Sequence, residues 1–544
     1  MNLKHVFFKK TSSNTALIDV DGIDGGGSGG GSGDRTVYGV VIPTDSSTTL
    51  QKVKLVSGAL TAVDSFDYTP CHYWKGCVRD IANKETAYYL NSNDWSLKKD
   101  GTQSDLSGAD GDVVVHIEKF FTLYGTVHNG TYAGRDFILC SRVRFMFEGE
   151  TADYDPAFSA ANDTGVAEDL YHYAYEAVLC DSAGAPKVTN RYATGGGTFA
   201  TGDRARSISG GHVWTNADQG KMEQAFQNNG CHGANWQIEA MIARMMLVYM
   251  GNRHMQGTSL GAGMAYAKEW KYEYARMTGR SNYIGNGCGS VTANQGITVA
   301  ITGNSEASGT YAISTESATF SDRVWTKGNY SIKASGTPGT STTAWAVYDN
   351  TDTAVVTSTD AAGSPAQCTW PTGTTMETMD AEIVWASSAV SDSTLRTVGT
   401  RFLGIENFYG NINKFQFGLY RMKKNDVDGI CFTTKASEHA TSVSAADSGT
   451  QLYDNWQAFT WPSSANYIKT IDLRTCLPLT VGAGTTTYYA DYFYRWSAAN
   501  EALARYVIRG GSASATTYAG PFCVGASNSV AYAGASVGGF GSAA

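Results

Sequence analysis

Charged side chains are scarce in this sequence, and they are not grouped by sign. Asp, Glu, Lys and Arg make up 17% of the 544 residues, below the roughly 25% that is usual for soluble domains. The net charge is −9, and the pairs Lys9-Lys10 and Lys423-Lys424 stand alone. Because phosphate backbones are bound through clusters of Lys and Arg, we expect no nucleic acid among the partners.

Long apolar runs are missing as well. No stretch reaches the roughly 18 apolar residues of a membrane-spanning helix, and the most apolar segment, 236–250, contains Glu239 and Arg244. The apolar run within Met1–Lys10 is too short for the hydrophobic region of a secretion signal. We therefore expect no membrane insertion and no signal peptide, with synthesis in a cytoplasm and release from the cell by lysis.

The ten cysteines are scattered singly, and no Cys-x-x-Cys occurs. Zinc and redox motifs are therefore not indicated, and we expect mostly reduced, buried thiols. Neither a His-Glu-x-x-His motif nor a P-loop is present. Cys231-His232 and Arg253-His254 are weak metal candidates, because lone histidines are usually structural.

Glycine (61 residues) and tyrosine (31 residues) are abundant instead, together with Ser and Thr. This composition is typical of strands joined by turns and of an extracellular or virion surface. The boundaries are an attachment segment at 1–23, a Gly/Ser linker at 24–35 that is natural or engineered, and a main domain in two parts, 36–294 and 396–544. Between these parts, 295–395 is rich in Thr, Ser, Ala and Gly and predicts an inserted β-domain.

Helical periodicity is confined to a few segments. One predicted helix begins near Thr215-x-x-Asp218 and ends at Gly230. A second covers 236–250, where apolar residues recur at helical spacing and Gly251 follows as a stop signal. A weaker pattern at 265–277 is interpreted as a third helix.

Three motifs resemble those of phage tail proteins with the C-type-lectin fold that formylglycine-generating enzymes share. They are Asp105–Phe120 (DLSGADGDVVVHIEKF), Trp236-Gln237 with Gly251–Gln256 after the helix, and Gly404–Ile412 (GIENFYGNI). The resemblance covers about 36–290 and 400–544. It implies an α+β, loop-rich, C-type-lectin-like fold with a β-rich inserted domain.

The GIENFYGNI motif contains three polar residues within an apolar context, Glu406, Asn407 and Asn411. We interpret them as internal polar groups that satisfy the backbone of a buried loop. The alternative is a structural calcium ion, since carboxylate and amide oxygens are hard ligands. No other cofactor is expected.

The C-terminal segment, about 488–544, has the order YYxDYF, RGGS, AGPFCV and VGG. This order resembles the variable proteins of diversity-generating retroelements, in which adenine-directed mutation rewrites the 3′ end of the gene. Between Arg509 and Ala544 there is no charged residue and no histidine. The positions between the apolar anchors are Ala, Ser, Thr, Tyr or Asn, a vocabulary that is also typical of antibody paratopes.

Within the C-terminal segment we predict two kinds of residue, exchangeable ones that contact ligand and fixed ones that hold the backbone and core. Tyr494 and Trp496 are interpreted as aromatic anchors beside the binding face, with a place in the core as the alternative. The family usually has Arg where Phe540 stands, so the closing strand is expected to pack differently. The residues predicted to hold backbone and core are Gly510, Gly511, Pro521, Phe522, Val524, Val537 and Gly538. The residues predicted to contact ligand are Tyr494, Trp496, Ala513, Ser514, Ala515, Thr517, Tyr518, Ala526, Ser527, Asn528, Tyr532, Ala533 and Ala535.

The resemblance implies a phage receptor-binding protein at the tip of a tail fibre. Such a protein adsorbs to a bacterial surface receptor, protein or glycan, attaches to other virion tail proteins through its N-terminus, and forms a homotrimer in the virion. The alternatives are a capsule-polysaccharide depolymerase, whose carboxylate pair leaves no sequence motif, and a bacterial surface adhesin with the same variable domain. The oxidase chemistry of the fold relatives needs two adjacent cysteines, whereas Cys476 and Cys523 are far apart, so we expect no enzyme.

Overall fold

The computed structural model describes residues 36–66, 69–187, 198–263, 278–279, 281–293, 396–441, 455–496, 504–512, 515–534 and 536–544, and the backbone of the strands between 297 and 384. The predicted attachment segment, the Gly/Ser linker and the helix predicted at 265–277 lie outside the described residues.

Two six-stranded sheets form the first part of the main domain. One has the strand order β11 (Asp153–Tyr154), β7 (Phe121–Thr126), β8 (Asp136–Ser141), β1 (Tyr38–Ile42), β2 (Gln51–Val56) and β3 (Ala59–Ala62). The central sheet has the order β15 (His232–Gly233), β36 (Gly541–Ala543), β12 (Asp169–Tyr173), β6 (Asp112–Glu118), β4 (Lys75–Asp80) and β5 (Glu85–Tyr89). Short pairs join β9 (Met146–Phe147) to β10 (Glu150–Thr151) and β13 (Val178–Cys180) to β14 (Arg204–Arg206).

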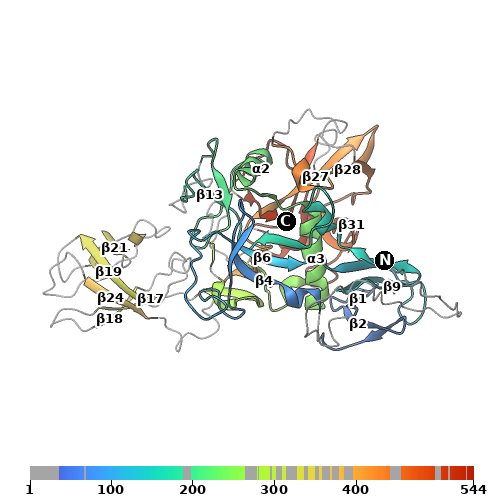
Figure 1. The fold of residues 1–544 in the computed structure, drawn as a ribbon, viewed down its shortest axis with the longest axis horizontal. Coiled ribbons are helices and arrows are strands. Elements are labelled where there is room, and N and C mark those ends of the chain that lie inside the picture. Colours follow the sequence, from blue (N-terminus) through green and yellow to red (C-terminus); the bar gives the residue numbers. More distant parts are fainter. Residues whose placement is uncertain are drawn as a thin grey trace, which may run out of the picture.

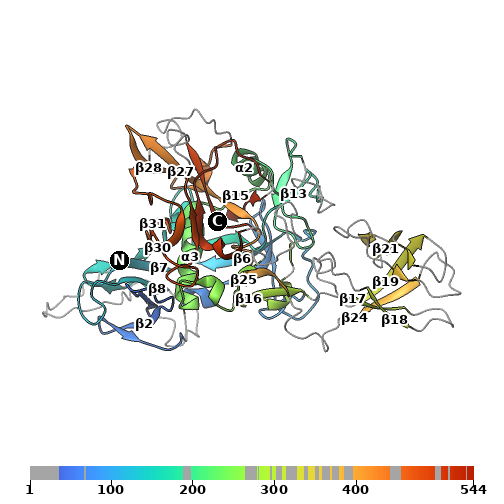
Figure 2. The same ribbon diagram turned by 180° about the vertical axis from the view of Figure 1, so that it is seen from behind.

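The second part of the main domain contributes a nine-stranded sheet. Its order is β29 (Asn455–Ala458), β28 (Val427–Phe432), β27 (Asn413–Lys424), β33 (Arg505–Gly510), β34 (Gly520–Gly525), β32 (Tyr492–Tyr494), β30 (Asn466–Ile471) and β31 (Pro478–Val481), with β35 (Val537–Gly538) beside β27. Strand β36 leaves this part of the chain and pairs with β12 and β15, so the chain ends at the central sheet, beside β15 (Figure 2).

Three α-helices are described: α1 (Pro156–Ala160), α2 (Gln219–Asn228) and α3 (Trp236–Met250). Helix α3 has the predicted bounds, with Asn235 as its N-cap and Gly251 following in the left-handed conformation at φ 61°. Helix α2 begins later than predicted, because Asp218 caps it by accepting from the amide of Lys221. Most of α3 is buried, and it contacts both β1 and β27 in the middle of the molecule (Figure 1).

The predicted α+β class is wrong. Strands account for 40% of the structure and helices for 13%, so the fold is β-rich. The two strongest helical patterns are real, but α2 and α3 contain only 10 and 15 residues of the chain. The Thr-, Val- and Tyr-rich segments around them pair across large sequence separations, and local periodicity does not reveal such pairing. The expectation of an α+β C-type-lectin-like fold therefore does not describe this chain.

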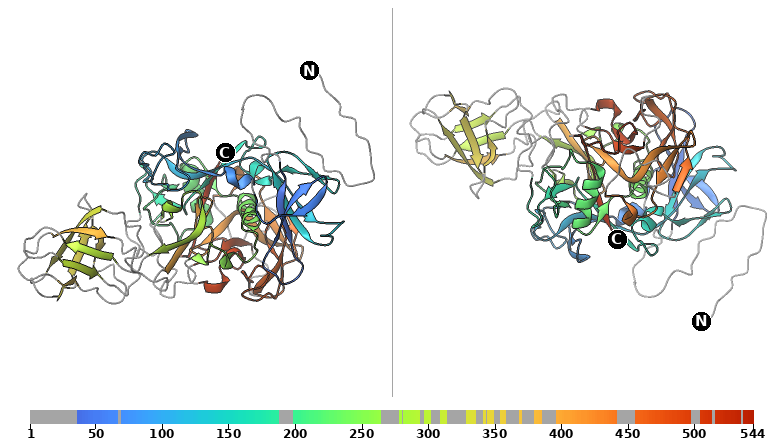
Figure 3. Two further views of the ribbon diagram at one scale, coloured as in Figure 1. Left: turned by 90° about the horizontal axis from the view of Figure 1, so that it is seen from below. Right: turned by 90° about the horizontal axis from the view of Figure 1, so that it is seen from above.

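A separate sheet lies between β16 (Cys288–Ala293) and β25 (Arg396–Phe402), which pair with each other and continue into β26 (Ile405–Glu406). Its order is β18 (Gly309–Ile313), β17 (Ile297–Ile301), β24 (Met379–Val384), β19 (Gly328–Ser335), β21 (Ala344–Tyr348) and β22 (Ala354–Thr357), with β20 (Ser341–Thr342) paired to β23 (Cys368–Thr369). It lies to one side of the other sheets (Figure 3), and its strands fall between the predicted boundaries at 295 and 395.

A buried ion pair ties the sheets to α3. Both oxygens of Asp155 accept from Nη2 of Arg244, at 3.0 and 2.8 Å, and neither side chain is more than 1% exposed. Arg244 also donates to the carbonyls of Leu473 and Arg474, at 3.1 and 2.9 Å. Asp155 caps α1 and accepts from the hydroxyl of Thr122 on β7. One charge pair thus connects the first sheet, two helices and the loop that follows β30.

The prediction of free thiols is confirmed for the described cysteines. None of these nine is in a disulfide; eight are buried and Cys288 is partly buried. Among the described helices, none is long and apolar enough to cross a membrane.

Candidate ligand-binding surface

The C-terminal segment forms its candidate surface on strand β32. Side chains alternate between the two faces of a strand, and Phe493 is fully buried while its neighbours Tyr492 and Tyr494 are partly exposed. Strand β32 pairs in parallel with β34 on one side and antiparallel with β30 on the other. The two tyrosines therefore lie on the outer face of a strand that other strands fix on both sides.

Two further tyrosines complete an aromatic group, named here the tyrosine surface: Tyr467, Tyr492, Tyr494 and Tyr518. The ring centroid of Tyr518 is 4.4 Å from that of Tyr492, 5.6 Å from Tyr467 and 6.1 Å from Tyr494. Tyr492 also contacts Tyr467 and Tyr494, at 5.3 and 4.9 Å. Such contacts hold the rings in place, and Tyr518 is the most exposed of them at 36%.

The turn that holds Tyr518 is anchored from the protein side. Residues Thr516–Tyr518 form a 3-10 turn, in which the hydroxyl of Thr517 is 2.9 Å from that of Tyr467. Gln256 donates from Nε2 to the carbonyl of Thr517 at 3.1 Å and also to the carbonyl of Ala519. The position of Tyr518 is therefore set by groups outside the C-terminal segment.

A buried carboxylate supports the same turn. Asp491 is fully buried, and its Oδ2 accepts from the amide of Phe522 at 2.7 Å. Burial raises the pKa of Asp491 well above its usual value, although the Phe522 amide and Arg509 oppose this. A Cβ on Gly520 would lie 2.0 Å from the other oxygen of Asp491, so only glycine fits there.

Arg509 forms a second support beneath β34. Its buried guanidinium donates to Gln416 at 3.1 Å, to the carbonyl of Pro521 at 3.2 Å and to that of Thr475 at 3.0 Å. Arg509 is the last charged residue of the sequence, and it serves the frame of the surface.

The predicted fixed residues are all buried, namely Gly510, Gly511, Pro521, Phe522, Val524, Val537 and Gly538. Phe540 is also buried, and its ring lies 5.0 Å from that of His172.

The predicted contact residues divide into three sets. Trp496, Ala515 and Ala526 are buried, with exposed fractions of 4%, 6% and 0%. Trp496 packs under the guanidinium of Arg421 at 3.9 Å and against Trp461 at 5.7 Å, so the core alternative describes it. Ala513, Ser514 and Ala535 lie outside the described residues. The partly or fully exposed set is Tyr494, Thr517, Tyr518, Ser527, Asn528, Tyr532 and Ala533.

Apart from Tyr494 on β32, the exposed set falls at the two ends of β33. Thr517 and Tyr518 lie in the turn beside Gly510, which pairs with Gly520. The segment 527–533 lies at the other end, where Tyr506 donates to the carbonyl of Asn528 and Arg505 faces Ser529. The single face expected from the sequence is therefore divided between two loops at opposite ends of one hairpin.

Sequence reasoning missed Tyr467, Tyr492 and Gln256 as members of this site. Tyr492 carried a signal, because it stands two residues before Tyr494 and shares its face in any strand. Tyr467 and Gln256 carried none, since they reach the turn from distant parts of the chain.

The three polar residues of GIENFYGNI are internal. Glu406 accepts from the amide of Gly279 at 2.9 Å and from the amide and hydroxyl of Ser281 at 2.8 and 2.5 Å. Asn407 and Asn411 donate to Glu176, whose other oxygen lies 2.9 Å from Nζ of Lys414. Protein donors thus occupy the oxygens of Glu406, as the polar interpretation predicts, and the calcium alternative gains no support.

A Glu–His–His cluster has the composition of a metal site: Glu223, His232 and His439. The Nδ1 atoms of the two histidines lie 2.7 and 3.2 Å from the two oxygens of Glu223. Asn235 uses its oxygen to cap α3, so its amide nitrogen donates to Nε2 of His439 at 3.1 Å. The proton of His439 is then on Nδ1 and faces Glu223, which makes this a hydrogen-bonded cluster rather than a set of free metal ligands.

The sequence matches no protein-family model, and no curated protein matches it either.

Proposed function

We propose that this chain is the receptor-binding protein of a tailed bacteriophage, which attaches to a bacterial surface through its C-terminal hairpin. The observation that carries the proposal is the tyrosine surface: four tyrosines joined by ring contacts of Tyr492 and Tyr518, on two strands and a turn that buried groups hold from beneath. Tyrosine offers a large, rigid contact area with a polar tip, at low cost in side-chain entropy.

The loop 527–533 supports the same function. Ser527, Asn528, Tyr532 and Ala533 are partly or fully exposed and lie next to a buried frame. Exposed substitutions usually change stability by less than about 0.5 kcal/mol. A diversifying mechanism of the kind that the tail resembles can therefore change these side chains while the frame stays folded.

Attachment to the virion through the N-terminal segment, and assembly as a homotrimer, belong to this proposal. A trimer presents three copies of the hairpin to one cell surface, so individually weak contacts gain avidity. Binding is non-catalytic in this proposal, and the receptor is a surface protein or glycan.

The first experiment measures attachment of the fluorescently labelled protein to a panel of bacterial strains by flow cytometry. We expect saturable binding to a subset of strains, and loss of that binding when Tyr494 and Tyr518 are both replaced by Ala. The matched control is Tyr283→Ala, which removes a tyrosine that is 50% exposed and lies outside the tyrosine surface. Binding to no strain, or undiminished binding by the double variant, would refute the proposal.

A second measurement tests the non-catalytic and diversified parts. Incubation with purified capsule polysaccharide should release no new reducing ends; their appearance would establish a depolymerase. Sequencing the DNA around the gene should find a near-repeat of the 3′ end that differs at adenines, beside a reverse transcriptase gene. An invariant 3′ end without such a repeat would show the surface to be a fixed one.

A further inference from the structure

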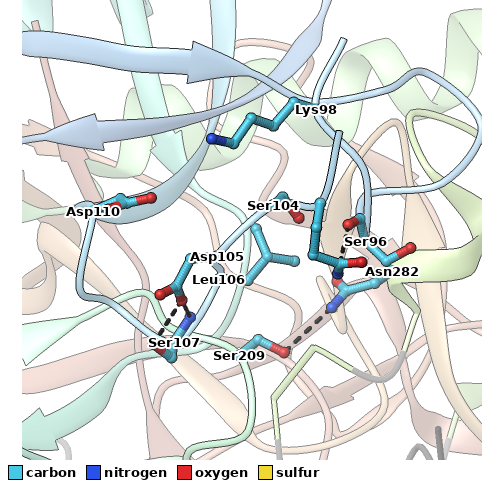
Figure 4. A pocket seen from close by; sticks show the side chains of 10 residues that line it. Ser96, Lys98, Ser104, Asp105, Leu106, Ser107, Asp110, Ser209 and Asn282 are labelled. Atoms are coloured by element: carbon cyan, nitrogen blue, oxygen red, sulfur yellow. Dashed lines mark hydrogen bonds between the residues drawn. The ribbon is translucent and has the colours of Figure 1, made fainter. Parts of the chain in front are cut away.

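A polar pocket lies outside the tyrosine surface. Its volume is about 550 Å³, within the range of about 300–1,000 Å³ that is usual for small-molecule sites. The segment between β5 and β6 forms most of its wall, and Ser209 and Asn282 close the other side (Figure 4). The lining residues are Ser96, Lys98, Gln103, Ser104, Asp105, Leu106, Ser107, Asp110, Ser209 and Asn282.

Hydrogen bonds to the surrounding protein fix the polar groups of this pocket. Oδ1 of Asp105 accepts from the hydroxyl and the amide of Ser107, at 2.6 and 2.8 Å. These two bonds lower the pKa of Asp105, so its carboxylate is ionised and accepts hydrogen bonds only. Asn282 donates to the hydroxyl of Ser209 at 3.2 Å and accepts from the buried Tyr175.

Lys98 and Asp110 form the opposite wall, beside Tyr88. The hydroxyl of Tyr88 donates to the carbonyl of Asp105 at 2.7 Å, and Oδ2 of Asp110 lies 3.1 Å from the same hydroxyl. The ammonium of Lys98 lies 4.3 Å from the centre of the Tyr88 ring. In Figure 4, Asp105 and Leu106 lie between Asp110 on one side and Asn282 on the other. Asp105 uses Oδ1 in its bonds to Ser107, so Oδ2 remains to accept from a ligand, and the exposed carboxylate of Asp110 can also accept.

The charge of the lining selects the class of ligand. Two carboxylates and one ammonium leave a local excess of negative charge, which disfavours phosphates and acidic sugars. The pocket combines the fixed carboxylate of Asp105, a second carboxylate, several hydroxyls and an amide around the side chain of Leu106. Such a lining suits a ligand that offers several hydroxyls and one less polar face. We propose that this pocket binds an uncharged saccharide unit, as a second binding site of the chain.

This site does not depend on the tyrosine surface. Its residues come from the first part of the main domain and the segment just before β16, and none belongs to the C-terminal segment. A saccharide held here is recognised by side chains outside the segment that resembles variable proteins, so the same sugar is bound whatever receptor the hairpin contacts.

The test uses the full chain and a panel of glucose, galactose, N-acetylglucosamine and oligosaccharides built from them, with saturation-transfer NMR for detection and calorimetry for affinity. Asp105→Asn keeps the shape of the side chain but removes its charge. The control is Asp100→Asn, because Asp100 makes the same turn, accepting from the hydroxyl and amide of Thr102 at 2.6 and 2.9 Å, and does not line the pocket.

We expect at least one member of the panel to bind, and Asp105→Asn to weaken it by roughly tenfold or more, since hydrogen bonds to charged groups contribute strongly. Asp110→Asn should act in the same direction, whereas Asp100→Asn and Tyr518→Ala should bind as the unmodified chain does. No binding across the panel, or equal loss in Asp100→Asn and Asp105→Asn, would overturn the proposal. A failure of cell attachment with intact sugar binding would count against the proposed function and leave this site standing.

Discussion

Replacement of Tyr518 by Ala separates a binding role from a packing role. The ring is 36% exposed and touches three other tyrosines. Truncating a fully buried aromatic side chain costs about 3–5 kcal/mol. The Tyr518 ring is only partly buried and its neighbours can relax, so we expect a loss of about 1–2 kcal/mol. That corresponds to a fall in Tm of roughly 2–8 °C, at about 2–4 °C per kcal/mol for a large domain.

Tyr518→Ala should reduce the free energy of receptor binding by a larger fraction than the free energy of unfolding. A central aromatic anchor typically contributes about 2 kcal/mol or more when it is truncated, which is a rise in Kd of about thirtyfold. Tyr518→Phe keeps the ring contacts, so its Tm should equal that of the unmodified chain and its binding should fall less. The assay is a binding isotherm on a strain that the unmodified protein recognises, with thermal unfolding of each variant measured in parallel.

Two results would refute this reasoning. A fall in Tm above about 15 °C for Tyr518→Ala would mean that the ring is a core element, because such a loss exceeds what a partly exposed side chain contributes. Unchanged binding with a small loss of Tm would mean that the receptor contacts another part of the molecule.

Three further predictions concern the frame of the molecule. Asp155→Ala should lower the free energy of unfolding by about 3–5 kcal/mol, because it leaves Arg244 buried without a counter-charge; in chemical denaturation, the double variant with Arg244→Met should lose less than the sum of the two single losses. Burial raises the pKa of Glu223, but the facing histidines outweigh it and lower the pKa from 4.5 to about 2. The stability from this shift is present above pH 4.5 and disappears as pH falls toward 2, so Glu223→Gln should flatten the fall of Tm in that window. An unchanged acid profile would contradict a stabilising role of Glu223. Gly520→Ala should destabilise the chain by about 1–3 kcal/mol through overpacking, whereas Gly165→Ala, where a Cβ meets nothing within 4 Å, should leave Tm unchanged.

Local patterns in the sequence predict local structure well. The bounds of α3 follow from its apolar spacing and from Gly251. The start of α2 was misplaced because Thr215 and Asp218 are both good caps, and only the structure shows which of them reaches a free amide.

Local sequence patterns could not predict the fold class. It depends on which strands pair, and strand β36 pairs with β12 although more than 360 residues separate them. Side-chain exposure in the candidate site was equally hidden, since Ala526 and Ser527 are both small residues and only one of them is buried. Composition identifies residues that suit a binding surface, but burial depends on the neighbours that the fold supplies.

The position of β36 has a consequence for synthesis of the protein. At about 5–20 residues per second, a ribosome needs roughly 20–75 s after completing β12 to reach residues 541–543. The central sheet stays open at that edge throughout this time. A stop codon or frameshift anywhere in the C-terminal segment leaves the gap unfilled, and the product exposes apolar core to proteases. If the gene is rewritten in this segment, only the products that are translated in frame past residue 543 complete the central sheet. Products with a stop codon or frameshift fail to fold and are removed by proteases.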